Sequence, residues 1–246
     1  MWRDEAVVVI PVYKETLTPN ERLSFEQCLR VLGHHPMTLV CPEGLRLDAY
    51  EPEKNHLAVR RFSAGYFQST ATYNGLMLSP RFYGAFLRYR YILIYQLDAF
   101  VFSDQLSAWC KEGYDYIGAP WIGTDWMPIL PMWRPPWSRY NLVGNGGFSL
   151  RNTLSATVMA TAFRRGVKRW KLNEDGFWAF FAPSYNPLFR IPDARTALRF
   201  SFETNPRLCY ERTGGRLPFG CHAWEKHDPE FWRVHIPGAG ALTTGA

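Results

Sequence analysis

Residues 7–13, VVVIPVY, form an apolar run that no polar residue interrupts. Continuous runs of β-branched side chains are typical of strands covered on both faces, as in parallel sheets. A helix start follows, because Thr18 can cap it, Pro19 suits its first position and Glu21 completes a capping box. A second apolar run spans residues 37–41. Strand, helix and strand in this order predict a βαβ unit, and therefore a doubly wound α/β sheet.

The same alternation continues to about residue 120. Further strands are expected over residues 57–62, 91–95 and 114–118, and further helices over 80–89, over 104–109 and after Asn152. No repeat or linker divides the chain, so we expect one domain over residues 1–236. The last residues, 237–246, are small and polar and are expected to be disordered.

The net charge of +6 and the pI near 9.1 suit an anionic partner. The basic residues lie in short scattered pairs without a nucleic-acid-binding motif, so we expect no nucleic acid partner. The five cysteines form no CxxC pair, which favours reduced, buried thiols over a zinc site. No apolar stretch reaches the roughly 18 residues of a membrane span. We expect a cytoplasmic protein, with peripheral contact to the inner face of a membrane as an alternative.

Residues 91–100, YILIYQLDAF, place a carboxylate inside an apolar run. An unpaired charge there would cost several kcal/mol, so either the strand ends at a cleft or Asp98 has a cationic partner. Ligands of open α/β sheets bind at the carboxyl ends of strands, where Tyr13 and Lys14 also lie. Asp98 is therefore a candidate ligand of Mg²⁺ or Mn²⁺, although a helix cap or turn would explain it equally well.

Three later segments carry further candidate groups. In NEDGFW, Glu174 and Asp175 are either a plain helix cap or a general base for an attacking hydroxyl. Gly146 and Gly147 allow a close approach of backbone to ligand, but the segment lacks the lysine of a P-loop and the spacing of a dinucleotide fingerprint. His222 is either a structural histidine or a second metal ligand.

Residues 121–140 contain four tryptophans and four prolines and have no helical or strand period. Such a segment is expected to be a long ordered loop or lid. Its aromatic rings, beginning with Trp121, could stack on a sugar, or the segment could be an irregular cover over the sheet edge.

These segments, in this order, resemble the GT-A-type glycosyltransferases. VVVIPVY is similar to the opening strand of their nucleotide-binding half, QLDAFVF lies at the position of their DxD motif, and NEDGFW is similar to the segment that carries the base of inverting members. His222 matches their late metal-binding histidine. A wider set of segments, from about residue 6 to 233, resembles a largely uncharacterised bacterial family of GT-A-like proteins: IPVYK, YNGLMLSPRFY, YDYIGAPW, NGGFSLR and LPFGCHAW.

The resemblance implies a mixed sheet, with a nucleotide-sugar half over residues 6–120 merged with an acceptor and catalytic half over 121–236. It implies transfer of a sugar, with inversion, from a nucleotide diphosphate donor such as a UDP-sugar to a hydroxyl of a glycan or lipid-linked acceptor, as in polysaccharide biosynthesis. Mn²⁺ or Mg²⁺ would assist the transfer. The resemblance leaves the donor sugar and the oligomeric state open.

The resemblance also assigns roles to residues of this sequence. Asp98 and His222 would hold the metal, and Asp175 would be the base, with Glu174 contacting the acceptor or exchanging roles with it. Substrate would lie against the following residues: Pro11, Tyr13, Lys14, Tyr73, Asn74, Gln96, Leu97, Trp121, Gly146 and Gly147. Gln96 is a departure, because the family has an acid there, so metal binding is expected to be weaker or dispensable.

Two other classes of protein fit parts of the pattern. A nucleotidyltransferase would share the sheet and the metal, but it needs a glycine-rich basic loop after the first strand, and IPVYKETLTP contains no glycine. A non-catalytic glycan-binding protein would keep the aromatic surface and would not depend on Glu174 or Asp175.

Overall fold

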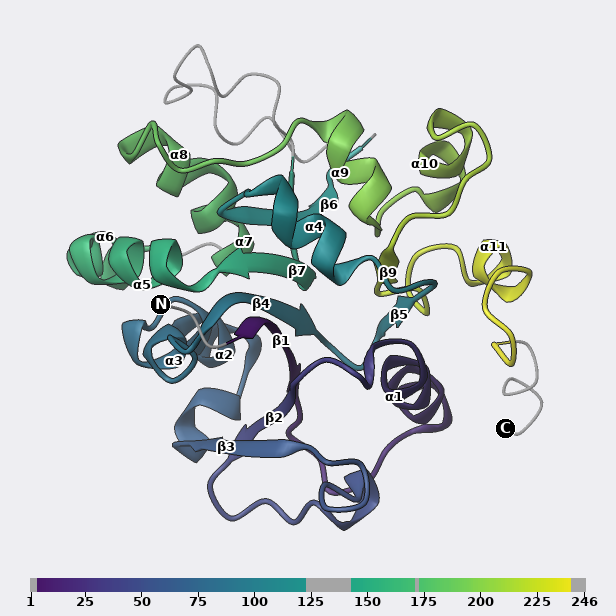
Figure 1. Cartoon of the computed structure of the whole chain (residues 1–246), viewed down its shortest axis with the longest axis horizontal. Helices are drawn as coiled ribbons and strands as arrows, with labels where there is room; N and C mark the ends of the chain where they lie inside the picture. The colour runs from purple at the N-terminus through teal and green to yellow at the C-terminus, as the bar shows by residue number, and fades with distance from the viewer. Residues whose placement is uncertain (1–3, 123–142, 171–172, 240–246) are drawn as a thin grey trace.

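The computed structural model describes residues 4–122, 143–170 and 173–239. Its centre is a six-stranded sheet of order β3-β2-β1-β4-β7-β6 (Figure 1). The strands are β1 (Asp4–Pro11), β2 (Met37–Pro42), β3 (Ala58–Phe62), β4 (Tyr89–Tyr95), β6 (Tyr116–Pro120) and β7 (Val143–Asn152). The first four in spatial order are parallel, and β7 runs antiparallel to both β4 and β6. The α/β fold with a mixed sheet is therefore confirmed.

Successive residues of β1 enter two different cores. Val7 and Val9 pack with α2 (Thr70–Met77), α3 (Pro80–Gly84) and α5 (Thr153–Ala162) on one face. Val8 and Ile10 pack with α1 (Pro19–Leu32), α4 (Leu106–Glu112) and α9 (Ala194–Phe200) on the other. Burial of each such side chain contributes about 1.5–3 kcal/mol, and two covered faces explain why the run needs no polar alternation.

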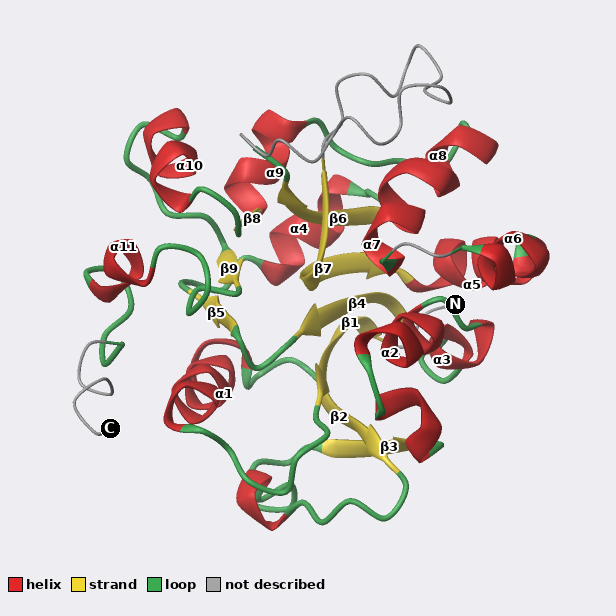
Figure 2. Ribbon diagram, turned by 180° about the vertical axis from the view of Figure 1, so that it is seen from behind, coloured by secondary structure: helices red, strands yellow, loops and turns green. Residues whose placement is uncertain are grey.

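A second, three-stranded sheet lies at the carboxyl end of β4. Its strands are β5 (Ala99–Val101), β8 (Ser201–Phe202) and β9 (Gly220–His222), in the order β5-β9-β8. Seen from behind in Figure 2, β5 and β9 lie between α1 and α10 (Pro206–Arg212). A third apolar cluster, which includes Phe100, Phe202 and Trp232, joins this sheet to α11 (Pro229–Arg233). Strands of two or three residues leave too little pattern for sequence analysis to detect.

The remaining helical segments of the described residues are short. They are α6 (Arg164–Arg169), α7 (Glu174–Gly176), a π-helical turn (Phe177–Phe181), α8 (Ala182–Tyr185) and two 3₁₀ turns (Asp48–Tyr50 and Ala64–Phe67). None of the helices in the described part of the chain is both long and apolar enough to cross a bilayer.

The structure tests several local predictions. The capping box of α1 is confirmed: Thr18 Oγ1 accepts from Glu21 N at 3.2 Å, and Glu21 Oε2 accepts from Thr18 N at 2.8 Å. Asn152 caps α5 through a 3.0 Å bond from Ser155 N. The expected helix over 80–89 is wrong in length, because it ends at Gly84 and gives way to turns that lead into β4.

Three further expectations concern the cysteines, the last residues of the chain and the tryptophan-rich segment. All five cysteines are free and buried. The backbone of Ala239 bonds to Ile236 O at 3.1 Å, so the first residues after 236 continue an ordered turn, whereas residues 240–246 lie outside the described residues. Most of the tryptophan-rich segment, residues 123–142, also lies outside them, and its expected role as a lid stays a prediction.

Candidate active site

The small sheet brings together three polar side chains that are far apart in sequence. Asp98 lies in the turn between β4 and β5, directly before Ala99, and Ala99 pairs with His222 across the antiparallel strands. Phe202 pairs with Cys221 in parallel register, so Glu203 comes next to His222. The strand register alone therefore places Asp98, His222 and Glu203 at one end of this sheet.

The His222 imidazole bridges two carboxylates. Its Nε2 lies 3.0 Å from Asp98 Oδ1, and its Nδ1 lies 2.8 Å from Glu203 Oε2. Burial lowers the pKa of His222, but the two carboxylates outweigh burial and raise it to about 10. The imidazole is therefore a cation at neutral pH when only these side chains surround it.

Asp98 has a second cationic partner in Lys226, whose Nζ lies 3.2 Å from Asp98 Oδ2. Burial opposes ionisation of Asp98, but the charges and hydrogen bonds of His222 and Lys226 hold its pKa below the usual range. The sequence offered two explanations for Asp98, and both apply: β4 has ended before Asp98, and Asp98 has cationic partners.

Gln96 joins the same cluster. Its Oε1 lies 3.0 Å from His222 Nε2, and its backbone N–H donates to Gly147 O at 2.9 Å. A Cβ at Gly147 would lie 2.0 Å from His222 Nε2, so only glycine leaves room for the ring. The sequence suggested that a ligand approaches the backbone of Gly147 closely. In the structure the group that lies against this backbone is the His222 imidazole.

Glu174 forms a buried ion pair with Arg151 of β7. Arg151 donates to Glu174 through Nη2–Oε1 at 2.8 Å and Nη1–Oε2 at 3.0 Å, and the residues are 1% and 6% exposed. A Cβ at Gly146 would lie 2.4 Å from Glu174 Oε1, so this glycine makes room for the pair. Both carboxylate oxygens are engaged, which suits a fixed charge better than a mobile base.

Asp175, the neighbouring carboxyl, forms no ion pair among the residues that the structure describes. Its Oδ1 accepts from Gly176 N at 2.7 Å. Burial and the negative charge of Glu174, with a smaller contribution from Glu203, raise the pKa of Asp175 to about 7. A carboxyl group that titrates near neutrality can accept or return a proton in a reaction at physiological pH.

Helix α2 extends the site on the other side of Gln96. The buried Tyr73 hydroxyl lies beside the Gln96 amide, and Asn74 Nδ2 donates to Asn173 Oδ1 at 3.2 Å. The structure thus brings the YNG and NED segments into contact, although about a hundred residues separate them.

The remaining predicted substrate residues lie at different depths. Tyr13 is 57% exposed after β1, and Lys14 beside it pairs with Glu21 at 2.9 Å. Pro11 and Leu97 are buried. Trp121 is 4% exposed, stacks on Phe180 and donates its indole N–H to Asn145, so the structure places its ring in the interior.

Sequence reasoning missed Glu203, Arg151 and Lys226. Glu203 directly follows β8 and comes after the apolar segment FSF, which is the signal that singled out Asp98, whereas Arg151 lies within β7 after the apolar segment FSL. Lys226 lies four residues after His222 in an irregular segment and carries no such signal.

The donor set around His222 Nε2 fits a divalent cation. Gln96 Oε1 and Asp98 Oδ1 both lie 3.0 Å from this nitrogen, and Glu203 fixes the ring from its other side, as partners of metal-bound histidines do. A second group of three ligand atoms comes from His34, His35 and Asp104, at the surface near the end of α1. The two groups need to be separated in any metal titration.

Comparisons with known proteins place this geometry in a wider context. A galactosyltransferase, LgtC, in complex with donor and acceptor sugar analogues is 13% identical, with a TM-score of 0.52 over 98% of this chain and 97% of that chain. Mouse xyloside xylosyltransferase 1, in its apo form, is 12% identical, with a TM-score of 0.50 over 89% and 97%. These similarities show that the chain has the fold of the GT-A glycosyltransferases.

No curated protein sequence matches the chain. A sequence family described as "Protein of unknown function (DUF5672)" matches residues 56–222, which include Asp98, Glu174, Asp175 and His222. Because this match spans more than half of the 246 residues, the chain belongs to the DUF5672 family.

Proposed function

We propose that the protein is a glycosyltransferase that moves a sugar from a nucleotide diphosphate donor to a hydroxyl group of an acceptor. The observation that carries this proposal is the arrangement of charge beyond β4. The Asp98–His222–Glu203 cluster lies there, and the charge of Glu203 contributes to the raised pKa of Asp175, which is about 7. A fold shared with sugar-transferring enzymes supports the same conclusion.

The cluster would receive the diphosphate of the donor. Asp98, His222 and Gln96 would hold Mn²⁺ or Mg²⁺, which when bound offsets the charge on the departing diphosphate. Lys226 would turn from Asp98 toward a phosphate oxygen, since its side chain is largely exposed and free to move. Tyr73 and Asn74 would line the ribose or base, and exposed Tyr13 would stack on the base, as in the UDP-sugar donor expected from the resemblance.

Asp175 would act as the base. It would accept the proton of the acceptor hydroxyl as that oxygen attacks the anomeric carbon and the bond to the diphosphate breaks, which inverts the configuration. Glu174 would act as a positioning residue, because its charge, fixed by Arg151, keeps the pKa of Asp175 high. One domain over residues 1–236 would carry both halves of this site.

Incubation of the purified protein with a panel of nucleotide sugars and Mn²⁺, following release of nucleoside diphosphate, tests the proposal. We expect slow release with at least one donor. Absence of both turnover and binding for every donor would contradict the enzyme assignment.

Replacement of Asp98 by alanine tests the metal site. The titration is made in a His34→Ala background, so that the surface group of His34, His35 and Asp104 does not contribute. We expect Asp98→Ala to weaken Mn²⁺ binding at least tenfold, while Asp48→Ala, at an exposed carboxylate, leaves it unchanged. Equal binding by Asp98→Ala and the background protein would show that the site does not hold the metal.

A further inference from the structure

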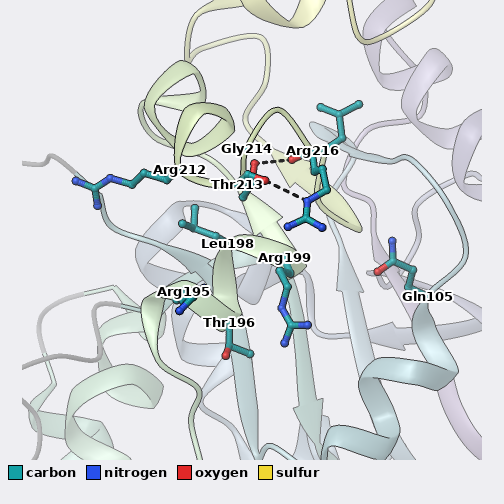
Figure 3. Close-up of a pocket in the computed structure, with 10 residues that line it drawn as sticks. Gln105, Arg195, Thr196, Leu198, Arg199, Arg212, Thr213, Gly214 and Arg216 are labelled. Atoms are coloured by element: carbon teal, nitrogen blue, oxygen red, sulfur yellow. Dashed lines mark hydrogen bonds between the residues drawn. The ribbon is translucent and has the colours of Figure 1, made fainter.

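A groove of about 560 Å³ lies between α9 and the turn that follows α10 (Figure 3). Its walls come from the residue before α4, from α9, from the end of α10 and from the turn after α10. The lining residues are Gln105, Arg195, Thr196, Leu198, Arg199, Arg212, Thr213, Gly214, Arg216 and Leu217. We propose that this groove binds a carbohydrate chain that carries carboxylate or phosphate groups.

Four arginines give the groove its charge. Arg195 and Arg199 lie one turn apart on α9, Arg212 ends α10, and Arg216 lies in the following turn, and all four residues are exposed. Among the described residues none of them forms an ion pair, whereas Arg46, Arg88, Arg151 and Arg207 all do. The lining residues include no carboxylate. An uncompensated group of guanidinium ions attracts anions.

Two of these arginines are held in place before any ligand arrives. Arg216 Nε donates to Thr213 O at 3.1 Å, and Thr213 Oγ1 donates to Arg216 O at 2.7 Å, which closes the turn (Figure 3). The Arg199 guanidinium lies 5.8 Å from the centre of the Trp109 ring. Fixed side chains lose less entropy on binding, which favours a specific site over a diffuse positive surface.

Asp193, the N-cap residue of α9, is a negative group close to Arg195 and Arg199. Its Oδ1 accepts from Thr196 N at 2.7 Å, and this cap, together with the charges of Arg195 and Arg199, holds its pKa low. Asp193 is therefore already engaged by the helix end, and it does not line the groove.

The chemistry of the lining selects the class of ligand. Guanidinium forks match carboxylate and phosphate oxygens, while the hydroxyls of Thr196 and Thr213 and the amide of Gln105 suit sugar hydroxyls. Among the described residues that line the groove none is aromatic, so these side chains offer no stacking surface for bases of a single-stranded nucleic acid. Leu198 is buried at its base and offers nothing for insertion into lipid. A chain of acidic sugars fits all of these groups.

The groove and the candidate active site lie at opposite ends of one short strand. Arg199 precedes β8 and Glu203 follows it, and four residues of extended chain cover at most roughly 13 Å. An oligosaccharide is therefore a ligand of suitable length to occupy the groove and extend beyond it. The interpretation of this oligosaccharide as the remote part of an acceptor rests on the proposed function. The binding of the oligosaccharide in the groove does not.

Direct binding of labelled oligosaccharides to the full-length protein, without donor, tests the inference. The probes are oligogalacturonate, a phosphomannan oligosaccharide and a neutral maltooligosaccharide of equal length. We expect one or both anionic probes to bind, with an affinity that falls as salt is added, and the neutral probe to bind at least tenfold more weakly. Arg199→Gln/Arg216→Gln and Arg195→Gln/Arg212→Gln should each weaken anionic binding about tenfold.

A matched control removes two positive charges elsewhere. Arg60→Gln/Arg165→Gln changes exposed arginines of β3 and α6, on parts of the molecule away from the groove, and should alter binding less than twofold. Circular dichroism verifies that each variant is folded. Equal loss in the control variant would reduce the effect to net charge and overturn the proposal.

Other outcomes would also contradict the proposal that the groove binds an acidic carbohydrate chain. Binding of the neutral probe as tightly as the anionic ones, or failure of both anionic probes, overturns it. Binding of pyrophosphate alone, or of phosphatidylglycerol vesicles but of no oligosaccharide, would assign the arginines to a small anion or to a membrane surface instead. Release of nucleoside diphosphate is measured separately, so failure of the donor assay contradicts the proposed function and leaves this result standing.

Discussion

At the scale of single residues, the two neighbouring carboxyls of the NED segment differ completely in environment. Glu174 has both oxygens bonded to Arg151, while Asp175 accepts one backbone hydrogen bond and forms no ion pair within the part of the chain that the structure describes. The fixed negative charge of the first raises the pKa of the second, which burial has already raised. Two neighbouring carboxyls in such different environments, one held in an ion pair and one with a raised pKa, are a common basis for acid–base chemistry.

Asp175→Asn should leave donor binding intact and lower kcat at least a hundredfold, because an amide cannot accept the proton. In the unchanged protein the ionised carboxyl is the active form, so kcat should rise with pH through about 7 and then level off. Steady-state kinetics from pH 5 to pH 9 measures both effects. A flat pH profile, or full activity of Asp175→Asn beside the control Asp48→Asn, would contradict the role as base.

Asp175→Asn should also stabilise the fold at pH 8. The pKa of Asp175 is higher in the folded protein than the ordinary value of 3.8, so ionisation costs stability as the pH rises from about 4 to about 7. Removal of this charge should add up to about 4 kcal/mol at pH 8 and little at pH 4. Thermal denaturation at the two pH values measures the difference, and an equal gain at both would refute this cause.

Glu174→Gln should destabilise the protein by about 3–5 kcal/mol, because it leaves the Arg151 guanidinium buried without its countercharge. The paired change Arg151→Met/Glu174→Leu should recover much of that loss. It should also lower the pH midpoint of kcat below 7, since Asp175 loses its negative neighbour. An unchanged midpoint in this double variant would show that Glu174 acts only structurally.

At the scale of elements, β7 and the small sheet position the cluster around His222. Gly147 of β7 lets the backbone approach the imidazole, and β9 holds the ring between Asp98 and Glu203. Ala223, directly after His222, has a φ of 50°, a conformation that costs of order 1 kcal/mol for a residue with a Cβ. Packing of Ala223 in the interior maintains this backbone and therefore the direction of the imidazole.

Gly147→Ala should displace the imidazole, because the added Cβ would lie 2.0 Å from His222 Nε2. We expect Mn²⁺ and donor binding to weaken at least tenfold. Gly84→Ala is the matched control, since no atom lies within 4 Å of its added Cβ, and it should be neutral or stabilising by about 0.5–1 kcal/mol. Calorimetric titration of folded variants measures binding, and wild-type affinity in Gly147→Ala would contradict this geometry.

At the scale of the whole molecule, Asp115 connects three segments that surround the sheet. Its Oδ1 accepts from Ser155 Oγ at 2.5 Å and its Oδ2 from Arg190 N at 2.7 Å, while its backbone oxygen accepts from Asn152 N at 2.8 Å. The start of β6, the start of α5 and the segment before α9 meet at this residue. Asp115 therefore fixes the strand β6 to the two segments beside it.

Asp115→Ala should lower the free energy of unfolding by about 2–4 kcal/mol, because the charged acceptor of two hydrogen bonds is lost, one from the partly buried Ser155 hydroxyl and one from Arg190 N. Asp115→Asn should lose less, since one oxygen remains. Urea denaturation measures both, and equal stability of Asp115→Ala and wild type would show that these bonds are made equally well with water.

The sequence by itself determined the longer strands of the parallel part of the sheet and several of the helices between them. The apolar run of β1, the Thr18 capping box and the Asn152 cap are local signals that act within a few residues, and the structure confirms each of them. A local signal also marked Asp98 as a candidate site residue, because a carboxylate at the end of an apolar run needs a partner. The helix that ends at Gly84 shows the limit of such signals, since they do not fix where a helix stops.

Only the tertiary structure decided which groups meet. His222 acquires Glu203 through the register of β8 and β9, and Asp98 acquires Lys226 from a segment 128 residues away. The Arg151–Glu174 pair, which gives the two NED carboxyls different environments, also joins distant segments. These contacts, and the pKa values that follow from them, depend on distances between strands that no local pattern of residues contains.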